Sequence, residues 1–278
     1  MRAKIIFEML GSLFVFLMMG VVSAPAQTCS ASELALLKQK VPEGYRIYSL
    51  LKDKQQFLTW LKCDDSQLDL ATAVHESVHV LTEENDAYPL INGTLIPRPH
   101  VVSAFAPPKK IASEMVKNFG PDDLFISTYL QPGAASSADD FMFLLDELNA
   151  YGHDLNTAVK LQGQTTVVQQ VDHRDGLAAM MAFVIAYTQK SMRNDQQSWQ
   201  GLQKETIINS LEAIWRQSEG VLTSSCGIPN FGTSDTSYIE YMCETKNTAA
   251  LTTILKRDPI CPKNCLVKRN YIGQDTPS

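Results

Sequence analysis

The stretch ATAVHESVHVL, residues 71–81, places two histidines four positions apart and a glutamate directly after the first. On an α-helix, residues i and i+4 lie on the same face, so His75 and His79 can direct two imidazoles at one metal ion. Glu76 lies about 100° further round such a helix, where a carboxylate can reach a metal-bound water without binding the metal. The stretch therefore predicts a metal-binding helix that also carries a catalytic base.

The residues around this motif favour a helix with one buried face. Its apolar residues recur at helical spacing: Val74, Val78 and Leu81. Upstream, Ser66 followed by Asp69 forms a capping-box pattern, so we expect the helix to run from about residue 67 to 84. A helix that carries two incidental histidines and no metal is the alternative.

With these flanks the stretch resembles the active-site helix of the zincin metallopeptidases. In that family uncharged residues surround the two histidines and an apolar residue follows the second one. The matching residues here are Thr72, Ala73, Ser77, Val78, Val80 and Leu81. The resemblance implies a catalytic Zn²⁺ held by His75 and His79. It also implies that Glu76 is the general base, which takes a proton from the zinc-activated water and passes it to the leaving amine.

A catalytic zinc usually has three protein ligands, and the third must come from elsewhere in the chain. Metzincins place a third histidine shortly after the motif, with a glycine between, but the residues after His79 are VLTEEND. Gluzincins, the thermolysin-like zincins, instead use a glutamate from a downstream helix. Glu147, within LLDELNAY at residues 144–151, resembles the E-x-x-A-(D or Y) arrangement around that glutamate. The resemblance therefore implies His75, His79 and Glu147 as the metal ligands.

Tyr151 departs from the usual gluzincin pattern, in which an aspartate at this place orients a zinc-bound histidine. Its hydroxyl is expected to hydrogen-bond a ligand or to stabilise the oxyanion of a tetrahedral intermediate, so Tyr151 is a second candidate catalytic residue. Asp146 is an alternative third ligand. His153 and His173 are further candidates for stabilising a transition state, without local support in the sequence.

The cysteines point to an oxidising compartment, because their number is even and all six follow the N-terminal apolar segment. They are Cys29, Cys63, Cys226, Cys243, Cys261 and Cys265. Six cysteines allow about 15 connectivities, which a sequence does not distinguish. We expect local pairs, namely Cys29–Cys63, Cys226–Cys243 and Cys261–Cys265. A second zinc site at Cys261 and Cys265 is the alternative to the last pair.

The N-terminus has the pattern of a secretory signal peptide. Arg2 and Lys4 precede an apolar run, and Ala24-Pro25-Ala26 then provides small residues for cleavage after Ala26. An uncleaved membrane anchor is the alternative. The net charge is −6 for the whole chain and becomes −7 once residues 1–26, with two basic residues and one acidic residue, are removed. With this charge and no long basic run, nucleic acid is an unexpected partner.

The remaining patterns predict a mainly helical α+β fold in one domain, residues 27–278, with a cysteine-rich helical part at about 226–265. Asn92-Gly93 between two apolar runs predicts a β-hairpin at residues 88–99. Strands are also expected at 45–50 and 123–130, and a loop at 131–138. Helices are expected at 30–40, 52–62, 109–118, 175–192 and 203–220, and after Ser137 and Asp140.

Taken together, these patterns predict a secreted or periplasmic zinc peptidase that acts on a peptide or protein substrate. No membrane span is expected in the mature chain. A non-catalytic binding or assembly protein with a zincin-like fold is the main alternative, and an exported metalloprotease effector is another. Fold and motif do not identify the substrate.

Overall fold

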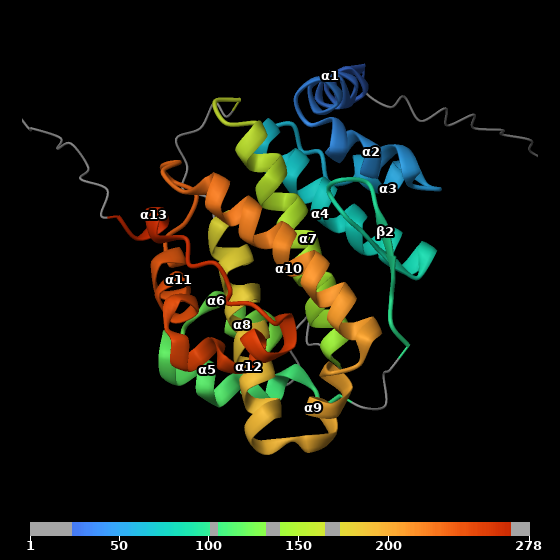
Figure 1. Cartoon of the computed structure of the whole chain (residues 1–278). Helices are drawn as coiled ribbons and strands as arrows, with labels where there is room; N and C mark the ends of the chain where they lie inside the picture. Colours follow the sequence, from blue (N-terminus) through green and yellow to red (C-terminus); the bar gives the residue numbers. More distant parts are fainter. Residues whose placement is uncertain (1–23, 101–104, 132–139, 165–172, 268–278) are drawn as a thin grey trace, which may run out of the picture.

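The computed structural model describes residues 24–100, 105–131, 140–164 and 173–267 (Figure 1). These ranges are mainly helical, with one small antiparallel sheet and three disulfides, and they confirm the expected α+β class. Residues 1–23 of the expected signal peptide lie outside the described ranges. So do residues 132–139, which contain most of the expected loop and Ser137.

The elements follow one another along the chain with short connections. The helices are α1 (Ala24–Lys40), α2 (Pro42–Leu50), α3 (Lys54–Leu58), α4 (Ser66–Asn85), the 3₁₀ helix η2 (Pro108–Ile111), α5 (Ala112–Phe119), α6 (Leu124–Tyr129), α7 (Phe141–Lys160), α8 (His173–Asn194), α9 (Gln196–Leu202), α10 (Glu205–Ser225), α11 (Asp235–Cys243), α12 (Thr245–Leu255) and α13 (Lys263–Leu266). The strands are β1 (Ala87–Pro89) and β2 (Leu95–Pro97).

Helices α4 and α7 pack side by side across the middle of the molecule (Figure 1). Each is started by an aspartate that accepts two backbone N–H groups of the first turn, Asp65 in α4 and Asp140 in α7. The expected helix at 67–84 is therefore confirmed, but its predicted capping box is wrong. The carboxylate of Asp69 accepts the backbone N–H of Cys63 instead of closing a capping box with Ser66.

Helix α2 forms where a strand was predicted at residues 45–50. Pro42 occupies the first turn, where a missing N–H is tolerated. The buried residues Val41, Gly44, Ile47 and Leu51 recur every three or four positions, so the segment buries a helical face against α4. The predicted strand at 123–130 is wrong for the same reason: α6 buries Phe125, Ile126 and Tyr129, which share one helical face.

The predicted hairpin is confirmed. Tyr88 of β1 pairs with Ile96 of β2, and the intervening turn uses Gly93 at φ +89°. Glycine adopts this left-handed backbone without strain. The carbonyl of Pro89 accepts hydrogen bonds from Asn149 Nδ2 (3.0 Å) and His153 Nε2 (2.8 Å), so the hairpin is fixed to α7.

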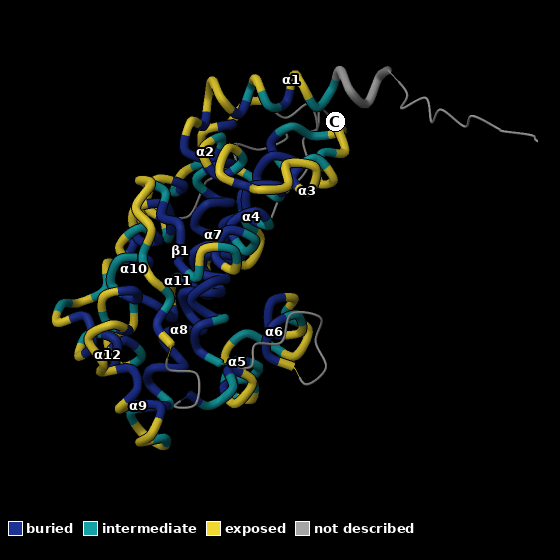
Figure 2. Tube along the Cα trace, turned by 90° about the vertical axis from the view of Figure 1, so that its right-hand side faces the viewer, coloured by how far each residue is buried: buried dark blue, intermediate teal, exposed yellow. Residues whose placement is uncertain are grey.

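Helix α8 runs through the main hydrophobic core. Every residue from Leu177 to Tyr187 is buried, and the helix contacts α7, α10, α11 and α12 (Figure 2). An apolar helix buried on all sides is typical of a protein interior. Among the described residues, no helix is both long enough and apolar enough to cross a membrane.

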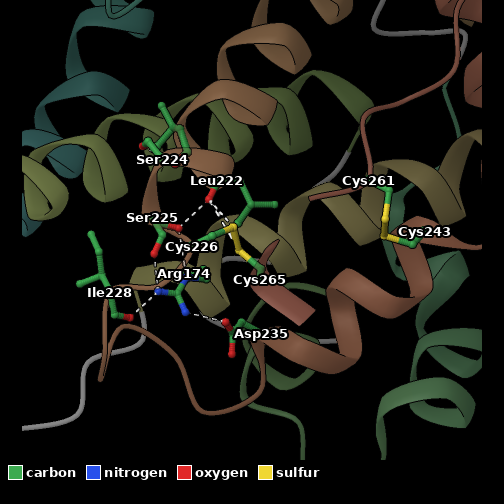
Figure 3. Close-up of a disulfide and its surroundings, with 11 residues drawn as sticks. Arg174, Leu222, Ser224, Ser225, Cys226, Ile228, Asp235, Cys243, Cys261 and Cys265 are labelled. Carbon is green, nitrogen blue, oxygen red and sulfur yellow. Dashed lines mark hydrogen bonds and ion pairs between the residues drawn. A yellow bond between two sulfur atoms is a disulfide. The ribbon is translucent and has the colours of Figure 1, made fainter. Parts of the chain in front are cut away.

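The disulfides confirm one of the three predicted pairs, Cys29–Cys63. The other two predicted pairs are wrong, because Cys226 pairs with Cys265 and Cys243 with Cys261 (Figure 3). Helix α11 lies between Cys226 and Cys243, and nine residues at about 1.5 Å each carry the second cysteine away from the first. The expected stapled C-terminal part is confirmed, the alternative zinc site at Cys261 and Cys265 is excluded, and three disulfides indicate an oxidising, extracellular environment.

Candidate metal centre

Two packed helices bring the candidate ligands together. Helix α4 presents His75 and His79 one turn apart, and α7 presents Glu147 opposite them. The Nε2 atoms of the two histidines are 3.2 Å apart, and Glu147 Oε2 lies 3.7 Å from that of His75 and 3.6 Å from that of His79. These residues form a group that could hold a metal ion.

The spacing of the three atoms fits a tetrahedral ion. Ligands bound at about 2.0–2.1 Å and separated by a tetrahedral angle are about 3.4 Å apart, which lies between the shortest and the longest separations found here. The carboxylate oxygen Oε2 of Glu147 is buried and has no hydrogen-bond partner among the described residues. A buried carboxylate oxygen is costly without a donor or a cation, and an ion between the three residues would satisfy it.

Asp146, the neighbour of Glu147 on α7, orients one of the histidines. Its Oδ2 accepts a hydrogen bond from Nδ1 of His79 at 2.6 Å, which leaves Nε2 directed toward His75 and Glu147. A carboxylate on the far ring nitrogen is the usual partner of a metal-bound histidine, because it fixes the tautomer and makes the ligand more basic. Asp146 therefore acts on a ligand, and its alternative role as the third ligand is not supported.

The electrostatics of the two histidines differ. Burial lowers the pKa of His75, and His79 lowers it further, so His75 is neutral and keeps a lone pair for a metal. Burial also opposes the protonation of His79, but hydrogen bonds to Asp146 and Glu147 outweigh it and raise the pKa of His79 to about 10. The two carboxylates thus make His79 the more basic member of the pair.

A cleft of about 180 Å³ lies beside the ligands. It brings the predicted base, Glu76, next to His75 and lines the remaining walls with residues of α4, α6, α7 and α8. The lining residues are Leu68, Thr72, His75, Glu76, Tyr129, Tyr151, Asp154 and His173. Glu76 is only partly buried, so its carboxylate can exchange protons with water in the cleft.

Tyr151 reaches the cleft from α7, one turn after Glu147. Its ring packs edge-on against the ring of His75, with centroids 4.6 Å apart, and its hydroxyl lies 2.8 Å from the hydroxyl of Tyr129. Burial raises the pKa of both phenols, so both hydroxyls stay protonated at neutral pH and can donate. Of the two roles predicted for Tyr151, donation to an oxyanion fits better, because among the described residues its hydroxyl bonds Tyr129 and no ligand.

His173 and Asp154 form a second histidine–carboxylate pair in the cleft. Nδ1 of His173 donates to Oδ1 of Asp154 at 2.5 Å, and both side chains are buried. The carboxylate fixes the ring and stabilises its charged form. The pair supplies a cationic or strongly polarised donor near Glu76 and Tyr151, and so gives the candidate role of His173 the local support that the sequence lacked.

His153 lies outside the cleft. It is 1% exposed, and its Nε2 donates to the Pro89 carbonyl of the hairpin. Burial lowers the pKa of His153 to about 4, while the Pro89 carbonyl and Glu43 raise it slightly and His75 lowers it. His153 is therefore a structural residue, and its alternative catalytic role is not supported.

The depressed pKa of His153 predicts an acid-sensitive fold. The unfolded chain takes up this proton near pH 6.5 and the folded chain only near pH 4, so protonation favours unfolding between these values. We expect wild-type protein to lose about 3 kcal/mol more unfolding free energy from pH 7 to pH 4 than His153→Gln, which keeps a donor for Pro89. Urea denaturation with a chelator present at both pH values measures this difference, and parallel losses in the two proteins would contradict it.

The structure brings together all five residues predicted for the site: His75, Glu76, His79, Glu147 and Tyr151. Sequence reasoning missed Asp154 and Tyr129. A signal for Asp154 was present, because it follows Glu147 by seven positions and Tyr151 by three and therefore shares their helical face. Tyr129 had none, since its segment was predicted to be a strand.

No family model, curated protein or solved structure is significantly similar to this chain. The assignment of the site therefore depends on its own geometry.

Proposed function

We propose that this protein is an exported zinc peptidase of the gluzincin type. The observation that carries the proposal is the convergence of His75, His79 and Glu147 on one point, with Glu76 in the adjoining cleft. Two imidazoles and one carboxylate are the ligand set of thermolysin-like catalytic zinc sites, and this set leaves a fourth position open. A site with only a structural role would need neither the open position nor the base.

The protein's own residues divide the work of hydrolysis. A zinc ion at the three ligands would supply Lewis acidity, which polarises a peptide carbonyl and makes a water more acidic. Glu76 accepts the proton of the attacking water and later donates it to the departing amine. Tyr151, Tyr129 and His173 line the cleft with donors that can stabilise the negative charge developing on the carbonyl oxygen.

Export agrees with the chemistry of the chain. Three disulfides require an oxidising compartment, and residues 1–26 carry the charged, apolar and small-residue regions of a signal peptide. Helix α1 begins at Ala24, so the proposed cleavage bond after Ala26 lies within its first turn. Mass analysis of the exported protein tests the position of that bond.

Two measurements test the proposal together. Metal analysis of the mature protein should find one zinc per chain, and digestion of a peptide library should be abolished by a chelator and restored by zinc. Zinc bound without any cleavage would favour the alternative of a binding or assembly protein. Cleavage that persists without metal would contradict the zinc mechanism.

Asp146→Asn is expected to weaken zinc binding about 10- to 100-fold, because the amide cannot make His79 more basic as the carboxylate does. The substitution keeps the size of the side chain and an oxygen for His79 Nδ1, so the fold should be retained. Competition with a zinc-binding dye measures the affinity. Asp154→Asn is the matched control: it alters the partner of His173 in the same cleft and should leave zinc affinity unchanged. Equal affinities of wild type and Asp146→Asn would contradict the role of Asp146.

A further inference from the structure

The first turn of α8 connects the cleft to the C-terminal part of the chain. His173 lines the cleft, whereas the next residue, Arg174, is directed toward the loop between α10 and α11 (Figure 3). Arg174 is 0% exposed, and a fully buried guanidinium is stable only when its charge and its N–H groups are matched by partners. The identity of those partners determines what holds this turn in place.

All the printed partners of the Arg174 side chain lie between residues 225 and 235. Nε donates to Ser225 Oγ at 3.0 Å, and Nη1 donates to Asp235 Oδ2 at 2.8 Å. Nη2 donates to the carbonyls of Ser225 (2.7 Å) and Ile228 (2.8 Å). The planar guanidinium thus joins the end of α10, the following loop and the start of α11, as only arginine can with fixed geometry.

The backbone of the turn and its next residue use the same loop. The N–H of Arg174 donates to the Phe231 carbonyl at 2.8 Å, which satisfies one of the N–H groups that a helix leaves open at its start. The carboxylate of Asp175 accepts hydrogen bonds from the N–H and hydroxyl of Thr233 and from the N–H of Ser234. The first turn of α8 is therefore tied to segment 225–235 by both its side chains and its backbone.

A disulfide closes this segment at its beginning. Cys226 directly follows Ser225 and is bonded to Cys265 of α13, next to the Arg174 cluster (Figure 3). The second C-terminal disulfide, Cys243–Cys261, lies away from this cluster and joins the end of α11 to the segment before α13. Only the first disulfide is adjacent to the residues that hold the turn.

The position of this turn also affects Tyr151. Gly176 lies so close to the Tyr151 ring that a Cβ atom there would meet Cε1 at 2.1 Å. The ring therefore packs directly against the backbone of α8, one turn from His173. A displacement of the turn would move two cleft residues at once, His173 through its own backbone and Tyr151 through this contact.

We infer that Arg174 is a positioning residue for the cleft: through segment 225–235 and the Cys226–Cys265 disulfide, it holds His173 beside Asp154 and the metal ligands. The catalytic consequence rests on the proposed peptidase function, whereas the structural coupling does not. Arg174 contacts neither the cleft nor the ligands, so it acts only through the turn that it anchors.

The test compares Arg174→Gln with wild-type mature protein. Long-range ¹H–¹⁵N spectra of the imidazoles report the Nδ1 hydrogen bond of His173, assigned with His173→Gln. We expect this signal to shift or broaden in Arg174→Gln, while the signal of His153, which is buried against Pro89, stays unchanged. Turnover should fall about 10- to 100-fold with one zinc still bound, since a displacement near 1 Å has effects of this size.

The two C-terminal disulfides provide a matched pair of controls. Cys226→Ser/Cys265→Ser should disturb the His173 signal as Arg174→Gln does, and Cys243→Ser/Cys261→Ser should leave it at the wild-type position. If Arg174→Gln does not fold, Asp235→Asn, which removes only the charge opposite Nη1, should shift the same signal less far.

An unchanged His173 signal in folded Arg174→Gln would overturn the inference. Equal shifts in the two disulfide variants would also overturn it, because they would indicate a general loosening. A shifted signal in a protein without peptidase activity would support the coupling and contradict the proposed function, so the two failures are distinguishable.

Discussion

Glu76→Gln is expected to lower peptide hydrolysis by about 1000-fold while one zinc ion stays bound per chain. Positioned acid–base groups contribute about 10²–10⁴-fold, and an amide has no basic oxygen at neutral pH. Glu76 lines the cleft and is only partly buried, so its replacement by a side chain of equal size should not disturb the helix. Initial rates on a cleaved peptide, with metal analysis of the same sample, measure both quantities.

Glu84→Gln on the same helix is the matched control. Glu84 lies about two turns further along α4 and contacts Lys52, away from the cleft. It should keep both zinc and activity, which would show that removing a negative charge from α4 is not itself harmful. An active Glu76→Gln protein would refute the role of the base. A Glu76→Gln protein that no longer binds zinc would instead show that Glu76 helps to hold the metal.

The sequence determined where the two site helices lie because their signals are local. In α4 and α7 an aspartate directly precedes each apolar pattern, and the pattern then persists for several turns. The segments at 45–50 and 123–130 are short and rich in β-branched and aromatic residues, so propensity favoured strands. Their helical form depends on a face buried against other helices, which a short window does not reveal.

Long-range relations were the part that the sequence could not provide. The correct partners of Cys226 and Cys243 depend on how α11 and α13 fold back toward α10. The role of Asp146 likewise depends on the rotation of α7 against α4, which directs Asp146 at Nδ1 of His79 and Glu147 at the space between the histidines. The motif and the helical spacing predicted a set of residues, and the packing assigned a role to each.

Glu147→Gln is expected to abolish the stabilisation by zinc without destabilising the metal-free protein. At a zinc concentration 100 times the dissociation constant, binding adds about 2.7 kcal/mol to wild-type stability, or about 5–10 °C in Tm. Glu147→Gln removes a ligand, so this gain should disappear. Without metal, the variant should be at least as stable as wild type, because Oε2 of Glu147 is buried without a hydrogen bond and His79 keeps Asp146 as its partner.

Glu219→Gln tests whether this behaviour is specific to a metal site. Glu219 is also buried, but its carboxylate accepts hydrogen bonds from Trp215 and Arg257, so its replacement should destabilise the protein by about 2–4 kcal/mol with or without zinc. Its zinc-dependent gain should match that of wild type. Thermal unfolding of the three proteins with chelator and with zinc distinguishes the two carboxylates. If Glu147→Gln lost stability in chelator as Glu219→Gln does, Glu147 would be a structural residue, and the gluzincin assignment would lose its third ligand.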